Sequence, residues 1–392
     1  MREIKDKHFY IFPPLCNKWL LTGTILLAIF GSFMIASAEM ASSTGDSSII
    51  VSAIIRQLVF VLIGITAMSI LSHIKIVSLK EVLITKVGFF VILGALLITR
   101  AFNPVGGAYA WISFGGFSIQ PSEFAKLYII ILFAKVLGKD YGPEQNKAYF
   151  KKLLLVAALY AGIIVLWQKD LGSAIVLVGI AFVLLMIANR KEFIYYQRRM
   201  LLVLLAIIAA GLFLLSPIGT SILENFDGYQ VARFLSSANP FKYQYDSGYH
   251  LIMSLVSFAT GGLFGLGYGR SIHKYMNFPN PDNDFILPVI VEELGLVGGF
   301  IPVIVLYGMV MIPLVKYSFK TSEVRQRIVF VGVFMYFFLH FCLNVGGVTG
   351  LIPLTGVPLL LLSSGGSSTL SCMMAVGVAL SEISRYEKSK RV

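Results

Sequence analysis

The sequence has little charge for its length, and this shortage narrows what the chain can be. Only 13% of its 392 residues are charged, whereas 57% are hydrophobic, and the mean hydropathy is +0.82. A soluble domain needs more polar surface than this composition supplies. The composition therefore predicts a polytopic membrane protein rather than a set of soluble domains.

Cysteine and histidine are also scarce, which argues against disulfide and metal scaffolds. The three cysteines (Cys16, Cys342 and Cys372) lie in the N-terminal flank or in apolar runs. None falls in an exposed outer loop, where a disulfide would be expected. The five histidines show no metal-ligand spacing. We therefore expect neither a disulfide framework nor a structural zinc site.

Apolar stretches of about 17–25 residues predict about ten transmembrane helices, and hence an all-α membrane domain over residues 1–392. The predicted spans are roughly residues 19–38, 48–72, 81–99, 121–138, 152–168, 171–188, 200–219, 285–314, 328–347 and 356–384. Ala36-Ser37-Ala38 resembles a signal-peptidase site, but the length of the first run favours a retained helix. The fifth and sixth spans should form a tight outer hairpin, and the eighth is long enough to tilt or project.

The basic residues predict the orientation of these helices. The net charge of +12 would suggest nucleic acid in a soluble protein, but most of the 32 Lys and Arg residues lie in or beside alternate loops and the two tails. The positive-inside rule then places both termini in the cytoplasm and leaves no need for a nucleic-acid partner. Residues from about 216 to 284 become a large extracytoplasmic loop between helices 7 and 8.

Asp284 ends this loop and precedes an apolar run. An Asp in this position is a common helix N-cap, and Asn283 or Asp282 could cap instead. Arg233, Arg270 and Lys274 share the loop, so a general base is the other interpretation.

Four further acids have both a structural and a chemical interpretation. They are Glu292 and Glu293 in the eighth span, Asp170 at the start of the sixth, and Glu123 at the start of the fourth. Glu292 lies eight residues after Asp284 and would fall near the same helix face, or it could form a buried structural pair. Asp170 could simply cap a helix, and Glu123 could simply pair with Lys126, which could also neutralise a pyrophosphate.

Small and hydroxyl residues gather near the start of the last span, at Ser363-Ser364-Gly365-Gly366-Ser367-Ser368. At membrane depth they predict a broken or closely packed helix that lines a cavity. Simple helix packing through small residues explains the serines equally well.

The order of short motifs along nearly the whole chain resembles the SEDS family (shape, elongation, division and sporulation) of bacterial cell-wall proteins. The motifs are Arg56-Gln57, Trp111-Ile112, Gln120-Pro121-Ser122-Glu123 with Lys126, Asp170-Leu171-Gly172-Ser173-Ala174, Arg233, Asn239-Pro240, Gly261-Gly262, Lys274, Asp284-Phe285-Ile286, Glu292-Glu293-Leu294-Gly295, Asn344, Thr355-Gly356, and Ser363 with Gly365-Gly366-Ser367-Ser368. Each motif is weak alone, and their order is what makes the resemblance specific.

The resemblance implies a ten-helix glycosyltransferase of the bacterial plasma membrane that polymerises lipid II into peptidoglycan strands. The expected partners are a class B penicillin-binding protein and other division or elongation membrane proteins. Asp284 would be the general base, and Lys126 and Arg233 would offset pyrophosphate charge. The remaining candidate substrate-binding residues are Lys274, Asp170, Glu123, Glu292, Glu293, Ser363, Gly365 and Gly366.

The sequence departs from the family pattern at Ala110, Lys169, His250 and Ser364. Lys169 could replace a basic charge that the family often has at position 110. The division-type members are the slightly better match.

Two other functions stay open at this point, a lipid II flippase and a non-catalytic scaffold for the penicillin-binding protein. A flippase should show inverted repeats and a charged path across the membrane, and neither is visible in the sequence. A scaffold would leave Asp284 unexplained. Carboxylates near pyrophosphate would suit Mg²⁺ or Mn²⁺, although no ligand set is visible.

Overall fold

The computed structural model describes residues 10–40, 47–75, 79–114, 117–226, 228–276, 278 and 280–391. These residues are mainly helical, which confirms the all-α prediction. Two short antiparallel strands in the described residues, β1 (Ile112–Phe114) and β2 (Phe117–Ile119), form a small sheet.

Among the described residues, ten helices make up the bundle. They are α1 (Lys18–Glu39), α2 (Ser47–His73), α3 (Gly88–Ile98), α4 (Pro121–Leu137), α5 (Pro143–Gly162), α6 (Leu171–Ile187), α7 (Ile194–Leu214), α12 (Ile301–Lys320), α13 (Val324–Val348) and α14 (Gly366–Ser389). Eight helical stretches in the described residues are long and apolar enough to cross a membrane. The other two, α4 and α6, have 17 residues each, and both pack against α13.

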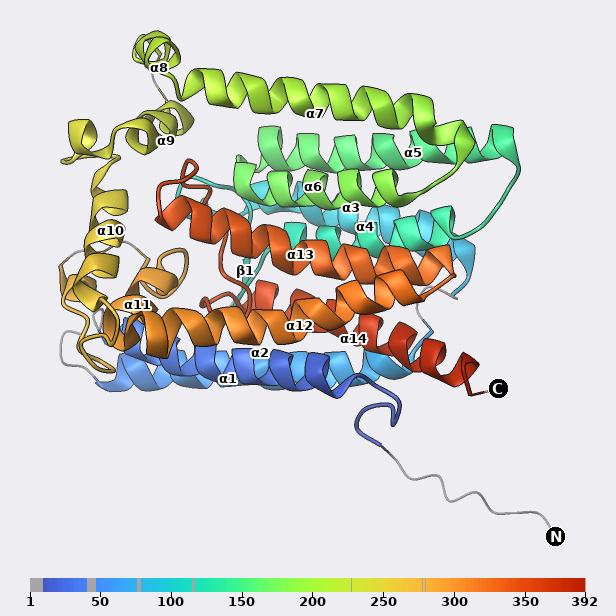
Figure 1. Cartoon of the computed structure of the whole chain (residues 1–392), viewed down its shortest axis with the longest axis horizontal. Helices are drawn as coiled ribbons and strands as arrows, with labels where there is room; N and C mark the ends of the chain where they lie inside the picture. Colours follow the sequence, from blue (N-terminus) through green and yellow to red (C-terminus); the bar gives the residue numbers. More distant parts are fainter. Residues whose placement is uncertain are drawn as a thin grey trace.

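The bundle helices lie roughly along one direction, and their two ends differ (Figure 1). Four short helices gather at one end: α8 (Pro217–Leu223), α9 (Tyr229–Ala238), α10 (Tyr249–Gly261) and α11 (Ile286–Gly295). The start of α1 and the end of α14 lie at the opposite end. This arrangement agrees with termini on one side and the large loop on the other, while which side faces the cytoplasm stays a prediction.

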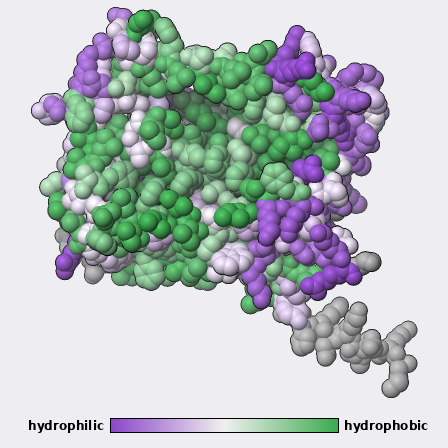
Figure 2. Space-filling model, viewed as in Figure 1, coloured by the Kyte–Doolittle hydropathy of each residue, from purple (hydrophilic) through white to green (hydrophobic). Residues whose placement is uncertain are grey.

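The surface matches a membrane environment. Figure 2 shows apolar residues across the middle of the bundle, hydrophilic residues gathered at the end where the chain finishes, and a smaller hydrophilic group at the opposite end. None of the α7 side chains whose burial is described is buried, whereas α13 and α14 bury much of their length. A helix that is apolar all round and unburied is stable only against lipid, so α7 forms the lipid-facing edge of the bundle.

The predicted eighth span is broken rather than continuous. Gly295 has φ 75° and ends α11, after which a π-helical turn (Leu296–Phe300) leads into α12. A Cβ at Gly295 would lie 2.3 Å from the Leu263 carbonyl oxygen, so only glycine permits this contact. The long apolar run is therefore a short helix, α11, followed by a full-length helix, α12.

The predicted tenth span was wrong at its start. Helix α14 begins at Gly366, and residues 351–365 form no helix. Pro353 and Pro358 interrupt helical hydrogen bonding there, and Gly356 and Leu361 have positive φ values of 69° and 66°. The small-residue pattern thus did mark a break in the helix.

Two other boundaries were displaced. Helix α7 spans Ile194–Leu214 rather than residues 200–219, and it ends earlier than predicted because Ser216 caps a new helix that starts at Pro217. Helix α5 begins at Pro143, in a polar stretch that hydropathy does not reveal. The tight hairpin between the fifth and sixth spans is confirmed, since only residues 168–170 separate the two helical segments.

Candidate functional site

Asp284 lies in the turn before α11, and its side chain does not cap that helix. The N-cap is Phe285, without a side-chain hydrogen bond. Instead Asn344 of α13 donates to the Asp284 carbonyl oxygen at 2.9 Å and fixes the backbone of the turn. No described residue donates a hydrogen bond to the Asp284 carboxylate. The structure therefore leaves this carboxylate available for chemistry.

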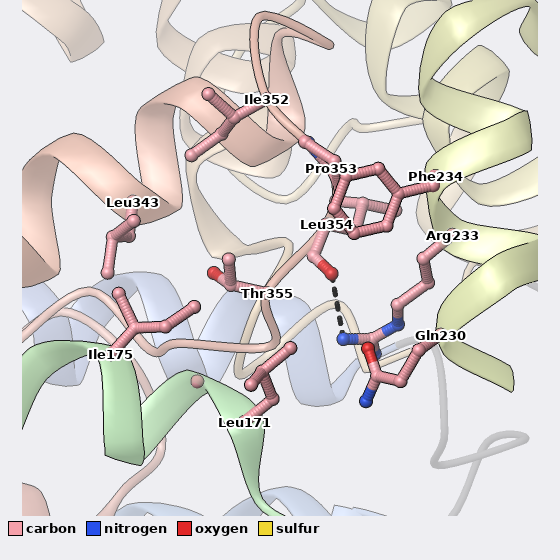
Figure 3. Close-up of a pocket in the computed structure, with 11 residues that line it drawn as sticks. Leu171, Ile175, Gln230, Arg233, Phe234, Leu343, Ile352, Pro353, Leu354 and Thr355 are labelled. Atoms are coloured by element: carbon pink, nitrogen blue, oxygen red, sulfur yellow. Dashed lines mark hydrogen bonds between the residues drawn. The ribbon is translucent and has the colours of Figure 1, made fainter. Parts of the chain in front are cut away.

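Arg233 of α9 meets Asp284 beside Gly356. A Cβ at Gly356 would lie 3.4 Å from Asp284 Oδ2 and 3.6 Å from both terminal nitrogens of Arg233. Because Gly356 is exposed and has no side chain, the space between it, the Asp284 carboxylate and the Arg233 guanidinium stays open. This place is the Asp284–Gly356 junction. Arg233 is itself positioned by a 2.8 Å hydrogen bond from Nη1 to the Leu354 carbonyl oxygen (Figure 3).

The electrostatics of the turn suit a general base. Burial raises the pKa of Asp284 from 3.8 to about 6. Arg233 opposes this rise, whereas the nearby carboxylates of Asp282 and Asp170 add to it. A carboxyl with a pKa near 6 is mostly ionised at neutral pH and is more basic than an ordinary Asp, which favours proton abstraction.

An apolar pocket opens beside Arg233. It has a volume of about 180 Å³. Its lining residues are Leu171, Gly172, Ile175, Gln230, Arg233, Phe234, Leu343, Ile352, Pro353, Leu354 and Thr355. In Figure 3 the Leu171 side chain of α6 lies nearest the guanidinium, and Ile175 of α6 and Leu343 of α13 lie farther from it. One cation at the end of an apolar pocket fits a ligand with an anionic head and a hydrocarbon chain.

A smaller and more polar pocket lies near the other side of the turn. Its volume is about 60 Å³, and it is lined by Ile35, Glu39, Arg56, Gln57, Phe60, Asp282, Ser364 and Gly366. The Ser364 hydroxyl donates to the Asp282 carboxylate. Sequence reasoning considered Asp282 only as a possible cap and missed this site. Its spacing of two residues from Asp284 in a Pro/Asn-rich turn was the available signal.

Asp170 has the structural role that the sequence allowed. It caps α6 by accepting from the Ser173 backbone N–H at 3.0 Å, and the Gln120 amide donates to it at 2.8 Å. Its carboxylate still acts on Asp284 through space. The structure thus brings Asp170 near the catalytic candidate as a neighbouring charge.

Glu123 and Lys126 form a buried pair inside the bundle. Lys126 Nζ lies 2.7 Å from Glu123 Oε1 and 3.1 Å from His340 Nε2, and only 1% of each member of the pair is exposed. The Tyr336 hydroxyl donates to the other Glu123 oxygen at 2.5 Å. The ion pair between Glu123 and Lys126 that the sequence allowed is therefore present, and Lys126 is buried away from solvent.

Glu293 and Lys274 form a second buried pair. Lys274 Nζ lies 2.7 Å from Glu293 Oε1, and it also donates to the hydroxyl and carbonyl oxygens of Ser37 in α1. The Gly269 backbone N–H donates to the same carboxylate at 3.0 Å. The pair therefore fixes the segment 262–273, the glycine-rich turn, against α1 and α11.

Glu292 binds the same turn rather than the Asp284 region. Its carboxylate accepts from the Ser271 hydroxyl at 2.6 Å and lies 2.7 Å from His273 Nδ1. The expectation that Glu292 shares a helix face with Asp284 was wrong, because α11 begins at Ile286, after Asp284.

The residues from Ser363 to Gly366 pack next to the turn that carries Asp284. The Ser363 hydroxyl donates to the Asn283 carbonyl oxygen at 2.8 Å. A Cβ at Gly366 would lie 2.3 Å from the Phe60 ring, and one at Gly365 would lie 2.2 Å from the Ser368 hydroxyl. These residues are tightly packed.

The described residues contain no group of three or more His, Cys, Asp or Glu side chains that could hold a metal ion. Mg²⁺ is often held by one or two carboxylates together with substrate phosphates, and Asp284 and Asp282 could supply such carboxylates. Metal dependence stays a prediction.

The comparisons with known proteins agree with this architecture. The family model FTSW_RODA_SPOVE, described as cell cycle protein, matches residues 18–389. Stage V sporulation protein E of Bacillus subtilis is 33% identical over 374 residues, covering 93% of this chain and 96% of the relative. Probable peptidoglycan glycosyltransferase FtsW of Coxiella burnetii is 30% identical and covers 93% of this chain and 95% of the relative.

Solved structures share the fold at lower identity. A chain from a peptidoglycan synthase complex has a TM-score of 0.68 at 23% identity, covering 95% of this chain and 98% of that one. Rod shape determining protein RodA of Thermus thermophilus has a TM-score of 0.58 at 19% identity, with coverage of 94% and 97%. The chain belongs to the FtsW/RodA/SpoVE family of cell cycle proteins, the SEDS family.

Proposed function

We propose that this protein is a peptidoglycan glycosyltransferase that polymerises lipid II at the outer face of the bacterial plasma membrane. One observation carries the proposal: Asp284, whose carboxylate accepts no hydrogen bond from the described residues and has a raised pKa, lies beside Arg233 at the end of an apolar pocket. A lipid-linked sugar pyrophosphate has the matching parts, a hydrocarbon chain, an anionic pyrophosphate and a reactive sugar carbon. The name of the FtsW relatives, probable peptidoglycan glycosyltransferase, points to the same activity.

The proposed chemistry assigns a role to each residue of this site. Ionised Asp284 takes the proton from an acceptor sugar hydroxyl as that oxygen attacks the anomeric carbon of the lipid-linked donor. The new glycosidic bond forms as the bond to the pyrophosphate oxygen breaks, with inversion from α to β. The lipid pyrophosphate leaves with the electron pair of that bond. Arg233 offsets the charge that develops on the leaving group.

The apolar pocket contributes to binding rather than to chemistry. Its volume of about 180 Å³ accommodates only the first part of a polyprenyl chain, and the rest would lie in the bilayer. Leu171 and Phe234 would contact that chain, and Arg233 would contact the adjoining phosphates. Holding the donor at both ends orients its anomeric carbon toward Asp284.

A class B penicillin-binding protein is the proposed partner, together with other membrane proteins of cell division or elongation. The fold shared with a chain of a peptidoglycan synthase complex supports this partner class. The proposed site lies at the end of the bundle where α8–α11 gather, and an extracytoplasmic transpeptidase would act on the product at that end (Figure 1).

The test is lipid II polymerisation by the purified protein with its cognate penicillin-binding protein, comparing wild type with Asp284→Asn. Asp246→Asn is the matched control, because Asp246 is an exposed acid of the same loop region. Glycan from wild type and from the control, but none from a folded Asp284→Asn protein, supports the proposal. Equal polymerisation by all three would remove Asp284 from catalysis. No glycan from wild type with bound partner would return the flippase and scaffold functions to consideration.

A further inference from the structure

Three polar side chains form a ladder along one face of α13, and each has partners on other elements. Tyr336, His340 and Asn344 are spaced four residues apart, so they lie above one another on the helix. All three are at least 97% buried. Burying a polar group lowers the stability of the fold unless the group is hydrogen-bonded. The hydrogen-bond partners of these three side chains therefore show which parts of the fold they connect.

The deepest rung binds the buried ion pair. The Tyr336 hydroxyl donates to Glu123 Oε2 at 2.5 Å and lies 2.5 Å from the Ser371 hydroxyl of α14. The Tyr336 ring also meets the His340 ring edge-on at 5.1 Å. This rung therefore connects α4, α13 and α14 around Glu123.

The middle rung connects the ion pair to the non-helical segment 351–365. His340 Nε2 lies 3.1 Å from Lys126 Nζ, and His340 Nδ1 lies 3.0 Å from the Pro358 carbonyl oxygen. The lysine ammonium can only donate and the carbonyl can only accept. The ring is therefore neutral with its proton on Nδ1, donating to Pro358 and accepting from Lys126.

The uppermost rung reaches the catalytic candidate. Both hydrogens of the Asn344 amide are used, one on the Val357 carbonyl oxygen and one on the Asp284 carbonyl oxygen, each at 2.9 Å. Val357 and Pro358 directly follow Gly356, the residue against which Asp284 and Arg233 meet. The ladder thus holds both sides of the Asp284–Gly356 junction.

We propose that His340 is a positioning residue, which couples the buried Glu123–Lys126 pair to the segment that carries Gly356 and thereby places Asp284 for reaction. This inference rests on the proposed function. It assigns Glu123 and Lys126 an indirect role, because their side chains contact the ladder and are closed to solvent. A segment of backbone without helical hydrogen bonds needs such partners to keep one conformation inside a membrane bundle.

The test compares His340→Leu with His340→Gln. Leucine removes both hydrogen bonds, whereas the glutamine amide can accept from Lys126 and donate to Pro358. We expect His340→Leu to lower kcat by about 10- to 100-fold, since a misplacement of about 1 Å costs about 100-fold, with KM within about twofold of wild type. His340→Gln should retain most of the activity. Phe330→Leu is the matched control, because Phe330 is a buried aromatic on α13 whose ring lies 5.9 Å from that of Tyr317 and which makes none of the hydrogen bonds described for the three ladder residues.

The pH profile separates positioning from a general loss of structure. Asp284 faces Arg233 of α9, Asp170 at the start of α6 and Asp282 of its own turn, while His250 of α10 packs against Phe285. Burial is the main cause of the raised pKa of Asp284. Loosening the segment in His340→Leu should therefore move the acid limb of kcat toward lower pH, and Phe330→Leu should leave it in place.

Hydrogen exchange supplies a readout that needs no catalysis. We expect faster amide exchange over residues 351–365 in His340→Leu than in wild type or His340→Gln. If His340→Leu fails to fold, His340→Asn takes its place, because the shorter amide can reach Pro358 but not Lys126, and kcat should still fall.

Three outcomes would overturn the inference. His340→Leu could keep the kcat and acid limb of wild type while Asp284→Asn is inactive, which would leave the proposed function intact. His340→Gln could be as impaired as His340→Leu. Amide hydrogen exchange over residues 351–365 could be the same in His340→Leu as in wild type. That result would count against the coupling on its own, whether or not the wild-type protein polymerises lipid II.

Discussion

The pH dependence of polymerisation gives the most direct test of Asp284 as the base. Its pKa is about 6, and only the ionised carboxylate can accept the acceptor proton. About one-tenth of the group is ionised at pH 5, about half at pH 6 and about nine-tenths at pH 7. The rate should therefore rise about tenfold between pH 5 and pH 7 and then level off.

Arg233→Met should move this profile in a known direction. Because Arg233 lowers the pKa of Asp284, its removal raises that pKa and shifts the acid limb to higher pH. An opposite charge at close range typically changes an Asp pKa by about one unit or more, so the rate at pH 6 should fall about fivefold relative to its plateau. Arg233→Lys keeps the charge and should keep the limb near its original position. The plateau itself should fall in both variants if Arg233 also contacts the leaving group.

The assay measures initial rates of glycan formation from lipid II between pH 5 and pH 8, with partner binding checked at each pH. Asp246→Asn, in the same loop region, should reproduce the wild-type profile. A flat wild-type profile from pH 5 to pH 7 would refute Asp284 as the titrating base. A shift of the Arg233→Met limb toward lower pH would refute the electrostatic relationship between the two residues.

Three further predictions concern stability. Because its pKa rises from 3.8 to about 6 on folding, ionised Asp284 lowers the free energy of unfolding by about 3 kcal/mol at neutral pH. This loss of stability is absent below pH 3.8 and develops as the pH rises toward 6. Asp284→Asn should therefore unfold at a higher temperature than wild type at pH 7, and a lower midpoint would contradict this. Lys126→Met leaves the Glu123 charge buried without its lysine, and should lower the free energy of unfolding by about 3–5 kcal/mol. The double variant Glu123→Gln with Lys126→Met should recover much of that stability in thermal unfolding. An equal loss of stability in the single and double variants would count against the ion pair. Gly295→Ala should reduce folded yield, because its Cβ would lie 2.3 Å from the Leu263 oxygen, whereas Gly298→Ala, with its nearest atom at 3.7 Å, should be tolerated.

The spans were predictable because a bilayer imposes a length on apolar runs, and most helices begin and end within a few residues of their predicted limits. The break at Gly295 was not predictable from the same signal. Its apolar run continues without interruption, and the cause is a backbone contact with Leu263, more than 30 residues earlier in the chain. Hydropathy reports burial in lipid, and it carries no information about such long-range backbone approaches.

The candidate site was predictable only in part, for a related reason. Asp284 and Arg233 were identified through the family motifs, and the structure brings them together at Gly356. His340 gave no signal in the sequence, because its partner Lys126 lies 214 residues away. A lone histidine in an apolar run cannot be assigned a role until both atoms facing its ring nitrogens are known.

The acids at the end of the bundle where α8–α11 gather differ in one physical respect. Glu292 and Glu293 accept hydrogen bonds from the glycine-rich turn, and Asp170 accepts from the start of its own helix. A carboxylate whose oxygens already accept several hydrogen bonds has fewer free lone pairs with which to take a substrate proton. Among the described residues no donor reaches the Asp284 carboxylate, and burial keeps its proton affinity high. Because sequence spacing does not show which acids are already hydrogen-bonded, the distinction between a structural acid and a catalytic one emerges only from the folded chain.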